Sequence, residues 1–198
     1  MVTEVASSGE TANYPVTFDV AYPDHLSRLL IFVKFLLAFP HFLIVYVLGI
    51  VSSLFTFIAF FAILFTKRYP RGLFDFVVNE NRWSANLAAY TYFLRDEYPP
   101  FSWDRGEYPV TYEVTYPDEL NRWLPLVKWF LAIPHQIVLF FLGLAALVVW
   151  VISWFAILLT GGIPRGMFDF MVGTTRWTYR VAAYTGLMTD EYPPFSLK

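Results

Sequence analysis

Residues 41–66 read HFLIVYVLGIVSSLFTFIAFFAILFT, and residues 135–160 read HQIVLFFLGLAALVVWVISWFAILLT. Neither stretch contains Asp, Glu, Lys or Arg. As a helix, each is long enough to cross the roughly 30 Å hydrocarbon core of a bilayer once. Because Ser, Thr, Gln and Gly are the only interruptions, the two stretches predict two membrane-crossing helices.

The composition of the whole chain also points to lipid. Of its 198 residues, 57% are hydrophobic, 21% are aromatic and 15% are charged, whereas soluble domains carry about 25% charged residues. A formal net charge of −2, without a Lys/Arg-rich stretch, argues against nucleic-acid binding. The absence of cysteine excludes disulfides, thiolate metal sites and cysteine nucleophiles.

The chain contains an internal repeat with a constant offset of 94 residues. The two copies align without a gap, and 45 of the 91 aligned positions are identical. The apolar stretches diverge most, whereas DEYPPFS recurs unchanged at residues 96–102 and 190–196. The repeat divides the chain into a disordered tail at residues 1–13, copies at residues 14–104 and 108–198, and a linker at residues 105–107.

Each copy begins with an alternation of apolar and polar residues, at residues 14–22 and 108–116. This alternation predicts a short β-strand. Asp24 and Asp118 follow a proline, where each is placed to cap the next helix.

Pro40 and Pro134 precede the long apolar stretches and are expected to break the helix, because proline lacks an amide donor. The segment upstream of each proline is too short to span and predicts an interfacial helix. From that helix, Lys34 and Lys128 are expected to reach water with their ammonium groups.

A polar stripe follows the predicted crossing helix in each copy. Its members recur at spacings of three and four residues, as on an amphipathic helix that lies on a bilayer. They are Asp75, Asn79, Arg82 and Asn86 in the first copy, and Asp169, Gly173, Arg176 and Arg180 in the second. The sequence thus predicts a mainly α integral membrane protein, in which each copy has a short β-strand, an interfacial helix, a membrane-crossing helix and an amphipathic surface helix.

The stripes also supply the candidate binding residues. Arg71 and Asp75, like Arg165 and Asp169, stand four residues apart, the spacing of an intrahelical ion pair. The same arginines could clamp a lipid phosphate or a carboxylate of a partner protein. The candidate lipid- or partner-binding residues are therefore Arg71, Asp75, Arg82, Arg165, Asp169 and Arg176.

His41 and His135 occupy equivalent positions in the two copies. A pseudo-twofold arrangement could bring them together as haem or metal ligands. The favoured interpretation is that each seals a carbonyl freed by the preceding proline. Asp96 with Glu97, and their counterparts, are expected to close a helix end instead of forming a catalytic dyad. No catalytic motif is present, so we expect no catalytic, metal or cofactor site.

Several motifs resemble one known family. They are PRGLFDF at residues 70–76, RW at residues 82–83, AAY at residues 88–90, DEYPPF at residues 96–101 and FAILFT at residues 61–66. In combination they resemble the bacterial membrane family called domain of unknown function 4389, in two tandem copies. The resemblance implies a small integral protein of the bacterial inner membrane. It carries over no catalytic residue.

Two topologies follow from the repeat. One crossing per copy makes an inverted repeat, which the flanking Lys and Arg residues mildly favour; turns near Gly49 and Gly143 would instead make shallow hairpins in parallel orientation. We expect a non-enzymatic accessory or scaffold subunit of a larger membrane complex, or a lipid-organising protein, whose partners are lipids and other membrane subunits. The alternative is a small oligomeric transporter or channel.

Overall fold

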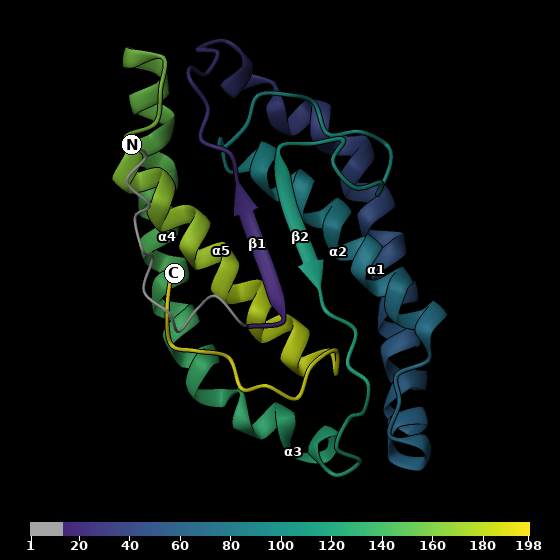
Figure 1. The fold of residues 1–198 in the computed structure, drawn as a ribbon. Helices are drawn as coiled ribbons and strands as arrows, with labels where there is room; N and C mark the ends of the chain where they lie inside the picture. Colours follow the sequence, from purple (N-terminus) through teal and green to yellow (C-terminus); the bar gives the residue numbers. More distant parts are fainter. Residues whose placement is uncertain (1–13) are drawn as a thin grey trace, which may run out of the picture.

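The computed structural model describes residues 14–198, so the predicted disordered tail lies outside the described residues. The described chain is mainly helical, with one small sheet (Figure 1). Its elements are β1 (Val16–Val20), the 3-10 helix η1 (Leu30–Phe32), α1 (Lys34–Thr66), α2 (Arg71–Thr91), β2 (Val110–Val114), α3 (Leu124–Leu131), α4 (Ile133–Thr160) and α5 (Arg165–Thr185).

The two predicted strands are confirmed, and they pair with each other across the two copies. β1 runs antiparallel to β2, with Phe18 opposite Tyr112 at the centre of the register. Alternate side chains of β1 point into the core, while Thr17 and Asp19 face outward. β1 packs against α5, and β2 packs against α2. The strand of each copy therefore packs against a helix of the other copy.

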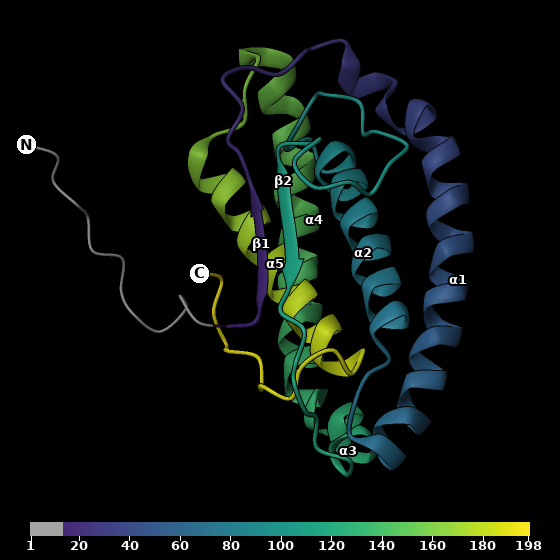
Figure 2. The same ribbon diagram turned by 45° about the vertical axis from the view of Figure 1, so that its right-hand side comes forward.

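Each copy also forms a helical hairpin, α1 with α2 and α4 with α5 (Figure 2). The backbone N–H of Leu26, ahead of α1, donates to the Gly161 carbonyl at the end of α4 at 2.8 Å. The N–H of Leu120, ahead of α3, donates to the Lys67 carbonyl at the end of α1 at 2.8 Å. The long helices α1 and α4 thus run in opposite directions, and a pseudo-twofold axis relates the copies through the centre of the sheet.

The prediction that the stripe-bearing helices are surface helices is wrong. α2 and α5 form an inner layer between the sheet and the outer helices, and no side chain from Leu73 to Thr91 is fully exposed. In α2 the polar stripe turns toward β2, with Arg82 and Asn86 both buried. The stripe looks like a water-facing surface only when one copy is considered alone, because the covering strand comes from the other copy.

The predicted helix break is wrong at Pro40, and in the second copy it is limited to one residue, Ala132. α1 continues through Pro40, whereas α3 and α4 are separated at Ala132, ahead of Pro134. The side chains that reach the backbone here are tyrosines. The Tyr98 hydroxyl donates to the Leu37 carbonyl at 3.0 Å, and Tyr192 does the same for the equivalent carbonyl of Leu131 at 3.1 Å. Each accepting carbonyl lies three residues before the proline, within an apolar helical stretch.

Two smaller predictions are also wrong. α1 and α4 run without interruption through Gly49 and Gly143, so the hairpin alternative fails. Asp24 and Asp118 cap no helix, because η1 and α3 begin several residues later and without a side-chain cap.

The outer helices α1 and α4 present large apolar surfaces. Each lies in a helical stretch that is long and apolar enough to cross a membrane, by length and composition. In the most apolar part of each stretch, 17% of the residues in α1 and 6% of those in Leu124–Thr160 are buried. Neither helix is therefore the buried core helix of an ordinary globular domain.

Candidate functional site

Arg82 joins α2 of the first copy to β2 of the second. Its Nε donates to the Tyr112 carbonyl at 3.3 Å, and its Nη2 donates to both carboxylate oxygens of Glu113 at 3.2 Å. Its Nη1 donates to Asn79 Oδ1 at 2.6 Å and to the Trp103 carbonyl at 3.1 Å. Every nitrogen of this buried guanidinium is engaged within the protein.

Arg176 makes the equivalent contacts from α5 of the second copy to β1 of the first. Its Nε donates to the Phe18 carbonyl at 2.8 Å, and its Nη2 donates to Asp19 Oδ1 at 3.0 Å. Its Nη1 donates to the Leu197 carbonyl at 2.9 Å. The two arginines therefore hold the strand of the other copy in place. All the donors of Arg82 are used within the protein, whereas the side chain of Arg176 remains 20% exposed, so lipid or partner binding by Arg176 stays a prediction.

The other candidate arginines lie on the surface. Arg71 Nε donates to Asp75 Oδ2 at 3.1 Å, and Arg165 Nε donates to Asp169 Oδ1 at 3.0 Å, as their spacing predicts. The guanidinium of Arg71 also lies 4.4 Å from the centre of the Tyr116 ring, which belongs to the other copy. All four charged side chains remain about half exposed or more. Binding of a lipid or partner at these four residues stays a prediction.

His41 lies in an aromatic cluster of its own copy. Its Nδ1 accepts a hydrogen bond from Trp83 Nε1 at 3.0 Å, and its ring stacks on Phe101 with centroids 4.1 Å apart. The buried Nε2 has no hydrogen-bond partner among the described residues. The histidine therefore does not seal a carbonyl freed by Pro40, and the side chain that bonds the backbone here is Tyr98, which donates to the Leu37 carbonyl.

His135 has the same surroundings in the second copy. Trp177 Nε1 donates to its Nδ1 at 3.0 Å, and its ring stacks on Phe195 at 4.0 Å. Since α1 and α4 start at opposite ends of the molecule, the pseudo-twofold axis does not bring the two histidines together. No group of three or more His, Asp and Glu side chains able to hold a metal ion occurs in residues 14–198.

Each copy also contains an ion pair between a buried lysine and a partly exposed aspartate, which no spacing in the sequence indicates. Lys34 Nζ lies 2.8 Å from Asp96 Oδ1 and donates to the Arg95 carbonyl at 2.6 Å. Lys128 makes the equivalent contact with Asp190 at 2.8 Å. Both lysine side chains are buried, so the expectation that their ammonium groups reach water is wrong. The only sequence feature that points to these pairs is that both the lysine and the aspartate are kept at equivalent positions of the two copies.

Glu80 is a buried carboxyl without a cation partner in the described chain. It accepts a hydrogen bond from Ser84 Oγ at 3.1 Å, and burial raises its pKa. Ser52 of α1, Tyr112 of β2 and Tyr179 of α5 are near enough to interact electrostatically with the carboxyl. The equivalent position in the second copy is Thr174, so the pseudo-symmetry is broken here.

A cavity of about 800 Å³ lies between the two hairpins. Its floor comes from α2 and α5, and its walls come from α1 and α4. The equivalent residues Ser84 and Thr178 both line it, so the cavity straddles the pseudo-twofold axis. No sequence pattern indicates this cavity, because its lining combines helices of both copies.

The motifs around these sites decide the family. The sequence profile of the domain of unknown function DUF4389 matches residues 28–102 and 123–196, which is most of the chain. The chain belongs to this family. Each DUF4389 match includes the buried Lys–Asp pair and the His–Trp pair of one copy, and each begins after the β-strand. The comparisons with curated proteins and with solved structures find no match.

Proposed function

We propose that the chain is a non-enzymatic integral membrane protein that acts as an accessory or scaffold subunit. In this account α1 and α4 cross the bilayer in opposite directions, and another protein covers the outward face of the sheet. One observation carries the proposal. The outer helices are apolar, whereas the outward face of the sheet, which lies level with the middle of these helices, carries charged side chains.

The exposed apolar side chains of the outer helices support burial in lipid. Large side chains of α1 and α4 such as Leu43, Tyr46, Phe57, Phe140 and Leu159 are exposed. The largest apolar patch on a typical soluble monomer is about 300–600 Å². On α1 and α4 the large apolar side chains are mostly exposed along the length of both helices, which favours hydrocarbon as their surroundings.

The charged outward face of the sheet supports a protein partner. The strands lie level with the middle of the long helices, with the inner helices α2 and α5 between them (Figures 1 and 2). Asp19 and Arg105 are well exposed there, with side-chain exposures of 66% and 75%, and Glu113 is partly exposed. A charge at this depth in a bilayer costs several kcal/mol when it faces lipid. If α1 and α4 cross, the sheet face therefore needs cover, which a second polypeptide supplies.

The positive charges favour one orientation. Exposed or partly exposed Lys67, Arg68 and Arg122 gather where α1 ends and α3 begins, whereas Arg28 and Arg165 lie near the other end. Cytoplasmic flanks carry an excess of Lys and Arg. We therefore place the end with Lys67 and Arg122 in the cytoplasm.

Site-specific photo-crosslinking in native membranes tests the partner. A photoreactive residue at Thr17 or Thr111, on the outward side of the sheet, should yield one discrete adduct with another polypeptide. The matched control is the same residue at Leu43 of α1, which should yield lipid adducts. Protein adducts from neither strand position, in membranes where Leu43 reacts with lipid, would contradict the proposal.

A second candidate function is transport by an oligomer. Antiparallel repeats with a cavity on their pseudo-twofold axis are found in several transporter folds, and the cavity described above has this location. Solute flux into liposomes that contain only this chain would favour transport. A requirement for a fixed protein partner would favour the scaffold.

A further inference from the structure

We propose that the cavity between the two hairpins binds an uncharged lipid whose head carries hydroxyl groups, such as a diacylglycerol or another long-chain alcohol. The inference goes beyond the scaffold role. It rests on the membrane location given under Proposed function but not on a protein partner.

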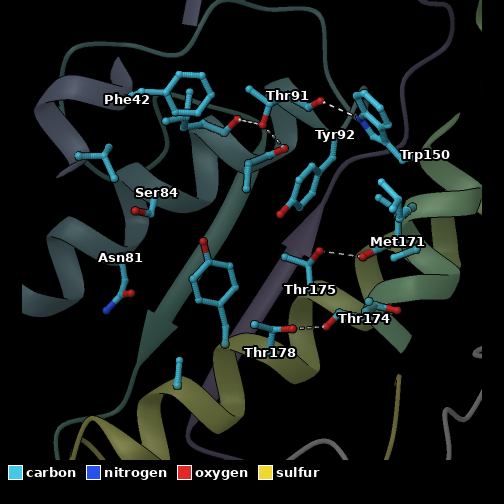
Figure 3. Close-up of a pocket in the computed structure, with 18 of the residues that line it drawn as sticks. Phe42, Asn81, Ser84, Thr91, Tyr92, Trp150, Met171, Thr174, Thr175 and Thr178 are labelled. Atoms are coloured by element: carbon cyan, nitrogen blue, oxygen red, sulfur yellow. Dashed lines mark hydrogen bonds between the residues drawn. The ribbon is translucent and has the colours of Figure 1, made fainter. Parts of the chain in front are cut away.

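The size and position of the cavity suit an amphipathic molecule. Its volume of about 800 Å³ falls within the range of about 300–1,000 Å³ that is typical of small-molecule sites. Figure 3 shows polar side chains of two inner helices on its floor, Asn81 and Ser84 from α2 and Thr174 and Thr178 from α5. The walls are apolar, so the head and tail of an amphiphile would each find suitable surroundings.

The charges around the cavity select a neutral head. Its lining contains no Asp, Glu, Lys, Arg or His. A phosphate or carboxylate in such a site would be desolvated without a cation, and an ammonium would be desolvated without an anion. Ordinary phospholipid heads and free fatty acids therefore fit poorly.

The hydrogen bonds on the floor select a hydroxyl group. Thr175 donates to the Met171 carbonyl at 2.8 Å, and Thr178 donates to the Thr174 carbonyl at 2.9 Å. Because these hydroxyl protons are used, the oxygens offer the cavity acceptor lone pairs. A ligand hydroxyl can donate to these oxygens, whereas a ligand carbonyl cannot.

Thr174 supplies a further, independent indication. Its side chain lines the cavity, the residue is 7% exposed, and its Oγ1 has no hydrogen-bond partner among residues 14–198. Buried hydroxyl groups are normally paired, since an unpaired one costs about 1–3 kcal/mol. Because this oxygen is fully covered in the structure, a ligand hydroxyl would pair with it once the threonine side chain turns toward the cavity.

The rim of the cavity gives such a lipid a route from the bilayer. Phe35 and Phe42 of α1 and Leu147 of α4 line the cavity and are also exposed, at 43%, 40% and 58%. They belong to the same apolar faces that we place in hydrocarbon. A lipid could therefore enter sideways between α1 and α4, with its head toward the inner helices and its chains along the outer ones.

Photo-labelling in nanodiscs tests the proposal. The full chain is reconstituted in neutral phosphatidylcholine with a diacylglycerol that carries a diazirine in one acyl chain, and the labelled peptides are mapped by mass spectrometry. We expect label on the wall segments of α1 and α4 around Phe42 and Leu147. Unlabelled dioleoylglycerol or a long-chain alcohol should compete, whereas oleic acid and phosphatidylglycerol should not.

A matched pair of glycines provides the variants. A side chain at Gly143, which lines the cavity, meets open space, so Gly143→Phe should fill the cavity without disturbing the backbone. Gly49 is its counterpart in the first copy, has equally open surroundings and lies outside the cavity lining. We expect Gly143→Phe to lower specific labelling at least five-fold and Gly49→Phe to leave it unchanged. Thr174→Val, which removes only the hydroxyl, should lower it about three-fold.

Equal labelling of the Gly143→Phe and Gly49→Phe variants would overturn the inference, as would competition by oleic acid or phosphatidylglycerol equal to that by dioleoylglycerol. Loss of the protein cross-link from Thr17 with retained lipid labelling would remove the scaffold role alone. Retained cross-linking without competable labelling would remove the lipid site alone.

Discussion

Arg82 and Arg71 stand eleven residues apart on one helix, yet they are expected to differ strongly in their contribution to stability. Arg82→Ala leaves the carbonyls of Tyr112 and Trp103 without this donor and removes one of the two ion pairs of Glu113, which also contacts Arg105. We expect it to lower the free energy of unfolding by about 3 kcal/mol. Arg71→Ala removes an exposed pair and should cost less than about 0.5 kcal/mol.

Thermal or denaturant unfolding of the purified protein in one detergent measures both variants. Arg82→Lys should recover little of the loss, because a lysine cannot reproduce a guanidinium that bonds four groups. Equal, small effects of the Arg82 and Arg71 substitutions would contradict the role assigned to the exchanged strands.

Glu80 should make stability depend on pH. Because burial raises the pKa of the folded carboxyl above its ordinary value of 4.5, the folded protein keeps this proton at pH values where the unfolded chain has lost it. Stability is then lost as the pH rises through the raised pKa. Glu80→Gln should remove this loss, so the variant should melt higher than the native protein near pH 8 and similarly near pH 4.5. Parallel melting curves of the two proteins at all pH values would contradict this assignment.

The residues predicted from sequence are those whose partners are local. The pair of Arg71 and Asp75 follows from helix spacing alone. The partners of Arg82 could not be predicted, because they lie on a strand of the other copy. Lys34 and Asp96 are 62 residues apart, and nothing in the spacing of a single copy indicates that they meet.

At the scale of elements, each tyrosine that reaches the backbone near a proline should stabilise the start of a long helix. Tyr98→Phe removes the donor to the Leu37 carbonyl, and Tyr192→Phe removes the equivalent donor to Leu131. Each is expected to lower the free energy of unfolding by about 1 kcal/mol. Tyr46→Phe, on an exposed part of α1, is the control and should have no measurable effect in detergent.

Element type was easier to predict than element placement. Alternation identified β1 and β2, and unbroken apolar composition identified α1 and α4. The pairing of β1 with β2 and the inner position of α2 depend on contacts between copies, which periodicity within one copy cannot contain. The continuity of α1 through Pro40 has no such explanation, because the tyrosine and histidine contacts around Pro134 are equivalent.

At the scale of the whole molecule, the exchange of strands makes each copy depend on the other. Residues 14–107 expressed alone keep the α1–α2 hairpin but lose β2, which covers the buried stripe of α2. We expect this fragment to aggregate or to be degraded, and co-expression with residues 108–198 to restore a stable complex. Size-exclusion chromatography in detergent measures the outcome. A stable monomer of either fragment alone would contradict the exchange.

The central claim is that α1 and α4 cross the membrane in opposite directions. Because the chain has no cysteine, single cysteines can be introduced at Arg68 and Arg122 at one end and at Arg28 and Gly162 at the other. Labelling with a membrane-impermeant maleimide, on intact cells and on inverted vesicles, measures the side of each position. We predict that Arg68→Cys and Arg122→Cys react from the cytoplasm, and that Arg28→Cys and Gly162→Cys react from the opposite side. Reaction of all four from one side would contradict the claim and place the long helices in the plane of the membrane.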